Sequence, residues 1–177
     1  MGCFPSQIWW LLFPLLSKPK GGFRPILLCA GCIRVWERSR RYYTDAFTQI
    51  SSRPYWAFGR GRSAEAAIWA QSIKAEASTT AGMAVGGFVW DGHKYYESFE
   101  LELLRDRALR VGVHPVLVKC TFNLWRGPRI VRLGRHSCPI AYFSACGLPA
   151  GDIFNDVFVK AYSLEAFDQY VRRNTLV

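Results

Sequence analysis

The chain has 177 residues, of which 50% are hydrophobic and 20% are charged. This composition excludes long-range disorder, because enough apolar side chains are available to form a buried core. Twenty-three Lys and Arg against thirteen Asp and Glu give a formal charge of +10. Such a charge favours a polyanionic partner, nucleic acid first and an anionic membrane second, and a merely soluble basic surface is the alternative interpretation.

The cysteines and the N-terminal apolar run bear on location. We interpret the six cysteines as reduced thiols, and the lone pair Cys29 and Cys32 lacks the further ligands that a zinc site needs. The run Ile8–Leu16 is short, contains Pro14 and has no basic residue ahead of it, which favours a buried strand over a signal peptide or a membrane span. We therefore expect a nuclear or cytoplasmic protein with no membrane partner, and a secreted or membrane protein is the alternative.

The first predicted element is a β-hairpin with a basic tip. Its turn, Lys18–Pro25, is rich in Gly and Pro and lies between apolar runs at Trp9–Leu16 and Ile26–Leu28. A helical pattern follows over Ile33–Tyr43, in which Arg34, Arg38 and Arg41 can face outward. The next stretch, Thr44–Gly61, is predicted to be irregular.

The best-marked helix begins after Ser63. This residue is a plausible N-cap, Glu65 suits the first turn, and apolar residues recur at helical spacing up to the breaker Ser78–Thr80. Beyond it, the apolar run Met83–Trp90 predicts a buried strand that ends at Asp91.

Two helices, a hairpin and a last helix complete the predicted order. The first helix covers about Ser98–Arg110 and stops at Gly112, and Pro115 opens the second, which ends near Gly127. A hairpin over Pro128–Phe143 and a helix from about Ile153 to Arg173 follow. The sequence thus predicts an α+β fold of mixed helices with short antiparallel strands, in one continuous unit.

Three ordered segments resemble motifs of reverse transcriptases. The first, residues 15–26 (LLSKPKGGFRPI), is similar to the fingers hairpin of retroelement polymerases, whose basic residues grip the triphosphate of the incoming nucleotide. The resemblance implies that role for Arg24 first and Lys18 second, and the planar fork of Arg suits phosphate oxygens. An ordinary solvated loop is the alternative for this segment alone.

The second segment, residues 88–99 (FVWDGHKYYESF), resembles the first palm motif, an apolar strand with an Asp at its end. The resemblance implies that Asp91 is the catalytic carboxylate that holds Mg²⁺, a cation that prefers oxygen ligands. It also implies that Tyr96 is the aromatic gate against a ribose 2′-hydroxyl. Alternatively, Asp91 caps a turn and Tyr96 packs in a core.

The third segment, residues 147–154 (GLPAGDIF), resembles the Pro-Gln-Gly loop and helix beneath the templating base pair. Gly151 would let the backbone approach nucleotide or template closely. The chain departs from the family pattern at Ala150, where Gln is usual, and at Asp152, which adds a negative charge. An ordinary loop before a helix is the alternative.

Basic residues between these motifs fit the same interpretation. Residues 58–65 (FGRGRSAE) resemble a retroelement stretch in which Arg60 and Arg62 would touch template phosphate. Further arginines interleave with Trp36 and Trp125, a mixture used for sequence-independent grip on a nucleic-acid backbone. These arginines are Arg34, Arg38, Arg40, Arg41, Arg126, Arg129, Arg132 and Arg135. A solvated helix face is the alternative for each of them.

Together the segments resemble a non-LTR, LINE-like reverse transcriptase. The resemblance implies fingers over about residues 8–85 and a partial palm over about residues 86–177, within one partial domain, 1–177. It implies an RNA-directed DNA polymerase that uses RNA template, DNA primer, dNTP and Mg²⁺. The family's Tyr-x-Asp-Asp motif is absent from these residues, so we expect the chain to be inactive alone. A non-enzymatic, basic nucleic-acid-binding remnant is the alternative.

Overall fold

The computed structural model describes residues 4–57, 61–86 and 94–173, and these residues form two compact units. Unit 1 consists of Met1–Gln49 and Lys94–Val177, and unit 2 consists of Ile50–His93. Unit 1 therefore combines residues from both the predicted fingers and the predicted palm. The mixture of helices and a small sheet confirms the predicted α+β class.

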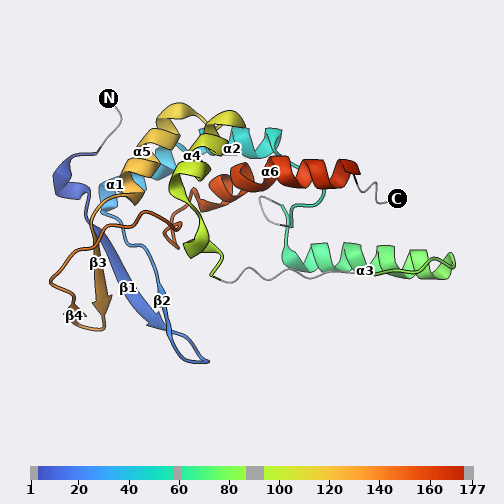
Figure 1. Ribbon diagram of the computed structural model, residues 1–177, viewed down its shortest axis with the longest axis horizontal. Coiled ribbons are helices and arrows are strands. Elements are labelled where there is room, and N and C mark those ends of the chain that lie inside the picture. Colours follow the sequence, from blue (N-terminus) through green and yellow to red (C-terminus); the bar gives the residue numbers. More distant parts are fainter. Residues whose placement is uncertain (1–3, 58–60, 87–93, 174–177) are drawn as a thin grey trace. The chain divides into compact units, whose positions relative to one another are not determined.

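The sheet of unit 1 has four strands in the order β2-β1-β3-β4. Strands β1 (Leu11–Ser17) and β2 (Phe23–Pro25) form the predicted basic hairpin, and β3 (Arg129–Leu133) and β4 (His136–Ser137) form the second predicted hairpin. The β1–β2 and β3–β4 pairings are antiparallel, as expected, whereas β1 also pairs with β3 in parallel, which the sequence did not predict. Parallel strands need a long crossover, and here all the intervening helices provide it. The two hairpins extend away from the helices of unit 1, with the β1–β2 turn at the far end (Figure 1).

Among the described residues, five α-helices belong to unit 1 or begin in it, and their bounds largely follow the predictions. They are α1 (Gly31–Ser39), α2 (Arg41–Ile50), α4 (Leu101–Arg110), α5 (Pro115–Trp125) and α6 (Asn155–Arg173), with short 3-10 turns at Ser6–Ile8 and Tyr96–Ser98. The prediction of an irregular segment from Thr44 is wrong, since α2 continues to Ile50. Thr44 and Phe47 explain the difference, because both are buried on one face of this helix.

Two packed clusters form the core of unit 1. Between the sheet and the helices lie Leu11, Phe13, Leu27, Ile33 and Leu124. Between α5 and α6, the rings of Phe122, Trp125 and Phe158 meet pairwise, with centroids 5.1 to 5.2 Å apart. Aromatic pairs at this spacing stabilise beyond the area that they bury.

The end of α5 fits closely against the N-terminal segment. A Cβ atom on Gly127 would lie 2.6 Å from the carbonyl oxygen of Trp9, so only glycine fits there without a shift. The Trp9 indole donates a hydrogen bond of 2.7 Å to the carbonyl of Asn123. Together these contacts hold β1 beside the start of β3.

Unit 2 contains the long helix α3 (Ala64–Thr80). Ser63 is its N-cap as predicted, because its hydroxyl accepts a hydrogen bond of 3.0 Å from the Ala66 amide. No residue of α3 is buried, although its sequence spacing suggested an apolar face. The buried strand predicted over Met83–Trp90 is not found in its described part, residues 83–86, which are exposed and irregular. Its remainder, with Asp91, lies outside the described residues.

Candidate functional site

The tip of the β1–β2 hairpin is a tight turn with exposed basic side chains. The Lys18 amide donates to the Gly22 carbonyl at 3.0 Å, and the Gly21 amide donates to the Lys18 carbonyl at 3.0 Å. Leu16 pairs with Arg24 in the strand register. Lys18 and Arg24 are both exposed, so their charges are open to an anionic partner.

The Pro149–Gly151 loop packs against the chain that leaves this hairpin. The Leu27 amide donates to the Ala150 carbonyl at 2.6 Å. Gly151 has a φ of +103°, and a Cβ atom there would lie 3.2 Å from the Cγ2 atom of Ile26. The close approach that glycine permits is therefore made to the protein's own backbone and side chains in this structure.

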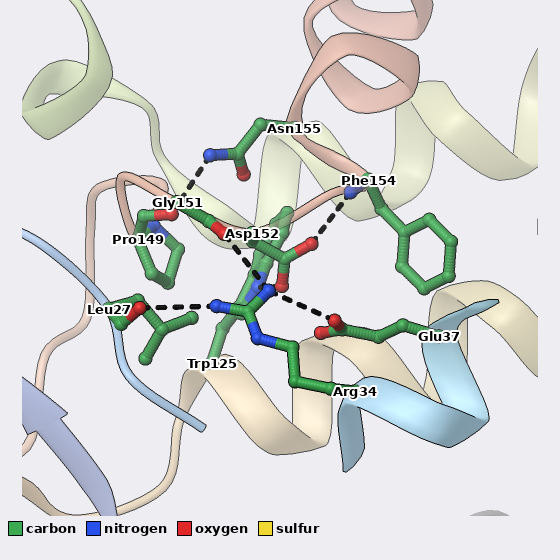
Figure 2. Close-up of polar contacts among 9 residues, drawn as sticks. All are labelled: Leu27, Arg34, Glu37, Trp125, Pro149, Gly151, Asp152, Phe154 and Asn155. Atoms are coloured by element: carbon green, nitrogen blue, oxygen red, sulfur yellow. Dashed lines mark hydrogen bonds and ion pairs between the residues drawn. The ribbon is translucent and has the colours of Figure 1, made fainter. Parts of the chain in front are cut away.

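A buried polar cluster fixes this loop in place (Figure 2). The Arg34 guanidinium reaches across from α1 and donates to the carbonyls of Gly151, at 3.0 Å, and of Leu27, at 3.2 Å. It also forms an ion pair of 3.1 Å with Glu37. Asn155 donates to the Pro149 carbonyl at 2.8 Å. One arginine thus links helix α1, the hairpin exit and the loop, 117 residues away along the chain.

Asp152 is a structural member of the same cluster. Its carboxylate accepts hydrogen bonds of 2.7 Å from the Trp125 indole and 2.7 Å from the Phe154 amide, at the start of α6. Asp152 departs from the family pattern, and its carboxylate is buried and hydrogen-bonded, so it does not face solvent. Asp152 lies two residues before Phe154, whose carbonyl accepts the first hydrogen bonds of α6, so its carboxylate lies near the positive end of the helix dipole.

Burial changes the protonation of the two acids in the cluster. It raises the pKa of Glu37 to about 7, with a further increase from the nearby Asp152 carboxyl, while the charge of Arg34 and its hydrogen bond act in the opposite direction. Burial also raises the pKa of Asp152 above its ordinary value, against the hydrogen bonds from Trp125 and Phe154 and the charge of Arg34. Glu37 and Asp152 share one guanidinium, that of Arg34, so the protonated form of these buried acids is favoured more than in an exposed carboxyl.

The loop, the hairpin and the segment around Tyr96 border one hollow of about 210 Å³. The Leu148 amide donates to the Tyr96 carbonyl, and the Gly147 amide donates to the Phe99 carbonyl, both at 2.7 Å. The ring of Tyr96 is partly exposed, and burial of its other part raises the pKa of its hydroxyl. The residues around the hollow are Phe13, Pro25, Tyr96, Glu97, Arg129, Tyr142, Ser144, Cys146, Gly147, Leu148, Pro149 and Ala150.

The predicted site residues are only partly brought together. Tyr96 and the loop that precedes Gly151 meet at this hollow, and Pro25 joins them from the end of β2. Lys18 and Arg24 are not among the lining residues. Asp91 and Arg60 lie outside the described residues, so their predicted roles stay predictions.

Arg62 lies in unit 2 and donates its hydrogen bonds to the chain itself. Its guanidinium donates to the carbonyls of Arg53 and Trp56, the latter at 2.7 Å, and to the Ser52 hydroxyl at 3.0 Å. These contacts hold the segment before α3 in shape. A phosphate partner for Arg62 would have to compete with them.

The predicted mixed surface of arginines and tryptophans needs correction at two residues. Trp125 is 0% exposed and Arg129 is 6% exposed, so neither belongs to the surface. Trp36 packs its ring edge-on against Phe4 and Phe154. Arg38, Arg132 and Arg135 are exposed, in agreement with an outward basic face.

The sequence singles out Arg34, Arg129 and Asp152 but predicts none of their contacts with the loop or the hollow, and it does not single out Glu37. Asp152 had a recognisable signal, since an Asp just before a predicted helix is a common N-cap. Glu37, Arg34 and Arg129 had no such signal, because contacts with distant parts of the chain decide how far each side chain is exposed.

Two general features complete the description. Within residues 4–57, 61–86 and 94–173, no group of three or more His, Cys, Asp or Glu is arranged to hold a metal ion. Asp91 lies outside these ranges, and its predicted Mg²⁺ role rests on the sequence resemblance. None of the helices in these ranges has the length and hydrophobicity needed to cross a lipid bilayer.

Comparison with known proteins gives no family assignment. No protein-family profile matches the chain, and no curated protein sequence matches it.

Proposed function

We propose that this chain is part of an RNA-directed DNA polymerase of the reverse transcriptase kind, similar to those of non-LTR retroelements. Lys18 and Arg24 would hold the triphosphate of a dNTP, Tyr96 would contact its sugar, and Asp91 would hold Mg²⁺. RNA template and DNA primer would be the macromolecular partners. One carboxylate cannot hold two catalytic ions, so the chain alone should not extend a primer.

The observation that supports this proposal is the meeting of separate motif segments around one hollow. Pro25 from the hairpin, Tyr96 after the second motif, and Pro149 and Ala150 from the third motif all line it. A polymerase that holds a nucleotide between fingers and palm needs contributions from these same three segments.

A second candidate function is non-catalytic nucleic-acid binding. The formal charge of +10 and the exposed basic tip at Lys18 and Arg24 favour it, because both serve a phosphate backbone without any chemistry. The two candidates differ in one respect that can be measured. Only the polymerase candidate requires a dNTP site formed by the hairpin, residues 18–26, and the loop, residues 147–151.

Photo-crosslinking separates the two candidates. The full chain is irradiated with an azido-dATP in the presence of Mg²⁺, and crosslinked peptides are mapped by mass spectrometry. The polymerase proposal predicts labelled peptides from residues 18–26 and 147–151, competed by any dNTP but not by a nucleoside. Arg24→Met should reduce labelling about tenfold or more, as expected when a charged hydrogen bond to phosphate is lost. Arg38→Met, which removes another exposed arginine from unit 1, is the matched control.

Binding to an RNA–DNA primer–template is measured by fluorescence anisotropy on the same proteins. Both candidates predict an affinity that falls at least about tenfold between about 50 and 200 mM salt. Salt-dependent binding without crosslinks at residues 18–26 and 147–151 would favour non-catalytic nucleic-acid binding over the polymerase. An affinity that does not change with salt concentration would contradict both candidates. Primer extension by the wild type that is abolished in Asp91→Ala would contradict the expectation that the chain alone is inactive.

A further inference from the structure

Arg129 is a buried cation at the start of β3. Its backbone pairs with Leu11 in the parallel register and with Tyr142 across an antiparallel bridge. Only 6% of the residue is exposed. The guanidinium donates from Nη2 to the Trp125 carbonyl at 2.9 Å, and its Cζ atom lies 5.2 Å from the centre of the Phe13 ring. The backbone on both sides thus fixes where this charge lies.

The protein itself leaves this charge incompletely matched. In the described ranges no carboxylate forms an ion pair with Arg129, although other arginines of unit 1 have such partners. Its Nε atom is buried without a hydrogen-bond partner. Burial lowers the pKa of the guanidinium, with Tyr142 acting in the opposite direction. Buried cations are ordinarily paired, because desolvation of an unpaired charge is costly.

Arg129 lines the hollow of about 210 Å³ described above, together with two tyrosines. Tyr96 and Tyr142 are each 40% exposed as residues, and each carries a hydroxyl that can donate a hydrogen bond. The hollow is smaller than the roughly 300 Å³ at the lower end of drug-sized ligand sites. A hollow of this volume can hold one anionic group with a few attached atoms, but not a whole drug-sized ligand.

We propose that this hollow binds a phosphate group, with Arg129 as its charged donor and Tyr142 and Tyr96 as hydroxyl donors. A phosphate has enough acceptor oxygens to use all three donors at once, and the planar guanidinium fits two of its oxygens. Glu97 borders the same hollow and supplies a negative charge. That charge repels an anion, so the phosphate would lie on the side of the hollow that Arg129 and the tyrosines line.

This site is separate from the phosphate grip assigned to the hairpin. That grip uses Lys18 and Arg24, which do not line the hollow. The phosphate site at Arg129 does not depend on the polymerase proposal, because a free phosphate or a phosphorylated small molecule could equally supply the group. Binding of inorganic phosphate tests the site itself, whereas azido-dATP crosslinking to the hairpin tests the polymerase.

Arg129→Met is the decisive variant, and Arg132→Met is its matched control. Both remove one arginine from β3, but Arg132 is exposed and donates its Nε hydrogen to the Gly134 carbonyl. Binding of labelled inorganic phosphate to the full chain is measured by equilibrium dialysis, with chloride at equal ionic strength as the reference. Acetate, deoxyadenosine and dATP are added as competitors to identify the chemical class and the source of the phosphate.

The wild type and Arg132→Met should bind phosphate alike, and Arg129→Met should bind at least about thirtyfold more weakly, as when one partner of a buried charged hydrogen bond is removed. Without phosphate, Arg129→Met should denature no more easily than the wild type, because it removes an unpaired buried charge. Should that variant fail to fold, Tyr142→Phe, which keeps the ring, should weaken binding about tenfold.

Three results would overturn the site. They are no specific binding by the wild type, equal binding by the Arg129→Met and Arg132→Met variants, and unchanged binding by a folded Tyr142→Phe variant. Competition by dATP but not by deoxyadenosine would identify a nucleotide phosphate as the ligand. Competition by acetate as strong as that by phosphate would contradict selectivity for phosphate.

Discussion

Helices α3 and α6 are of similar length, with 17 and 19 residues, but differ in what their side chains contact. In α6, Val157, Phe158 and Leu164 are buried against the rest of unit 1. In α3, none of the residues is buried, and Ile68, Trp69 and Ile73 are each 60% exposed or more. Packing against the rest of unit 1 therefore stabilises α6, whereas helix propensity and the N-cap account for α3 in unit 2.

The two sequences explain this difference. Helix α3 is rich in alanine, the residue with the highest helix propensity, and it has a hydroxyl N-cap. Helix α6 has several aromatic and β-branched residues, whose propensity is lower but whose burial stabilises more. Since helices of this length are marginal in water without packing, a helix can be well marked in sequence and still contribute little to a core.

The largest expected effect comes from removing an aromatic ring from α6. Phe158→Ala should lower the free energy of unfolding by about 3–5 kcal/mol, because the ring is 0% exposed and packs between Phe122 and Trp125. Trp69→Ala on α3 should change it by no more than about 0.5 kcal/mol, since that ring is 63% exposed. Urea denaturation followed by circular dichroism gives both values.

Phe158→Leu keeps most of the side-chain volume and should lower the free energy of unfolding less than Phe158→Ala does. It can therefore be measured even if the alanine variant does not fold. Similar losses for Phe158→Ala and Trp69→Ala would break the comparison between the two helices. They would mean that Trp69 is buried in the protein in solution.

The second prediction concerns the buried acid Glu37 in unit 1. Because the pKa of Glu37 rises from 4.5 to about 7 on folding, the folded state retains a proton that the unfolded chain loses within this range. The stability that this group contributes is thus fully present below about pH 4.5 and is lost as the pH rises through about 7. Glu37→Gln cannot ionise, so its advantage over the wild type should grow by up to about 3 kcal/mol between pH 4.5 and pH 8.

Urea denaturation of the wild type and Glu37→Gln across this pH range measures the difference. Asp152→Asn is a useful companion, because the pKa of Asp152 is raised as well, so its pH dependence should have the same sign. That variant should also lose stability at every pH, since an Asn cannot replace both hydrogen bonds to Trp125 and Phe154. A difference that is constant with pH, or that shrinks as the pH rises, would show that Glu37 is ionised in the folded protein.

Local signals predicted the individual elements well. Ser63, Pro115 and Gly112 marked helix ends correctly, and the Gly-rich turns marked both hairpins. The parallel pairing of β1 with β3 could not be predicted, because alternation along a strand does not reveal which distant strand lies beside it. The continuation of α2 to Ile50 was missed for a related reason, since tertiary burial of Phe47 outweighs weak local propensity.

The site was predictable only where a motif could be recognised. The meeting of Tyr96 with the Pro149–Gly151 loop agrees with the order of the motifs, but the hollow between them could not be derived from sequence. Arg129 and Trp125 were assigned to a surface because their residue types are common in nucleic-acid interfaces. Both are buried, since β3 begins next to the end of α5 and encloses them.

The smallest expected effect tests whether local signals alone account for α3. Ser63→Ala removes the hydroxyl that accepts from the Ala66 amide, and N-cap losses of this kind cost about 1 kcal/mol. Hydrogen exchange of the amides in the first turn of α3 should therefore speed up about fivefold. Ser72→Ala makes the same chemical change in the exposed middle of the helix, where alanine's higher propensity should slow exchange slightly. If the two variants shifted exchange in the same direction, the N-cap would not be what starts this helix, and contacts beyond the helix itself would have to be holding α3 in place.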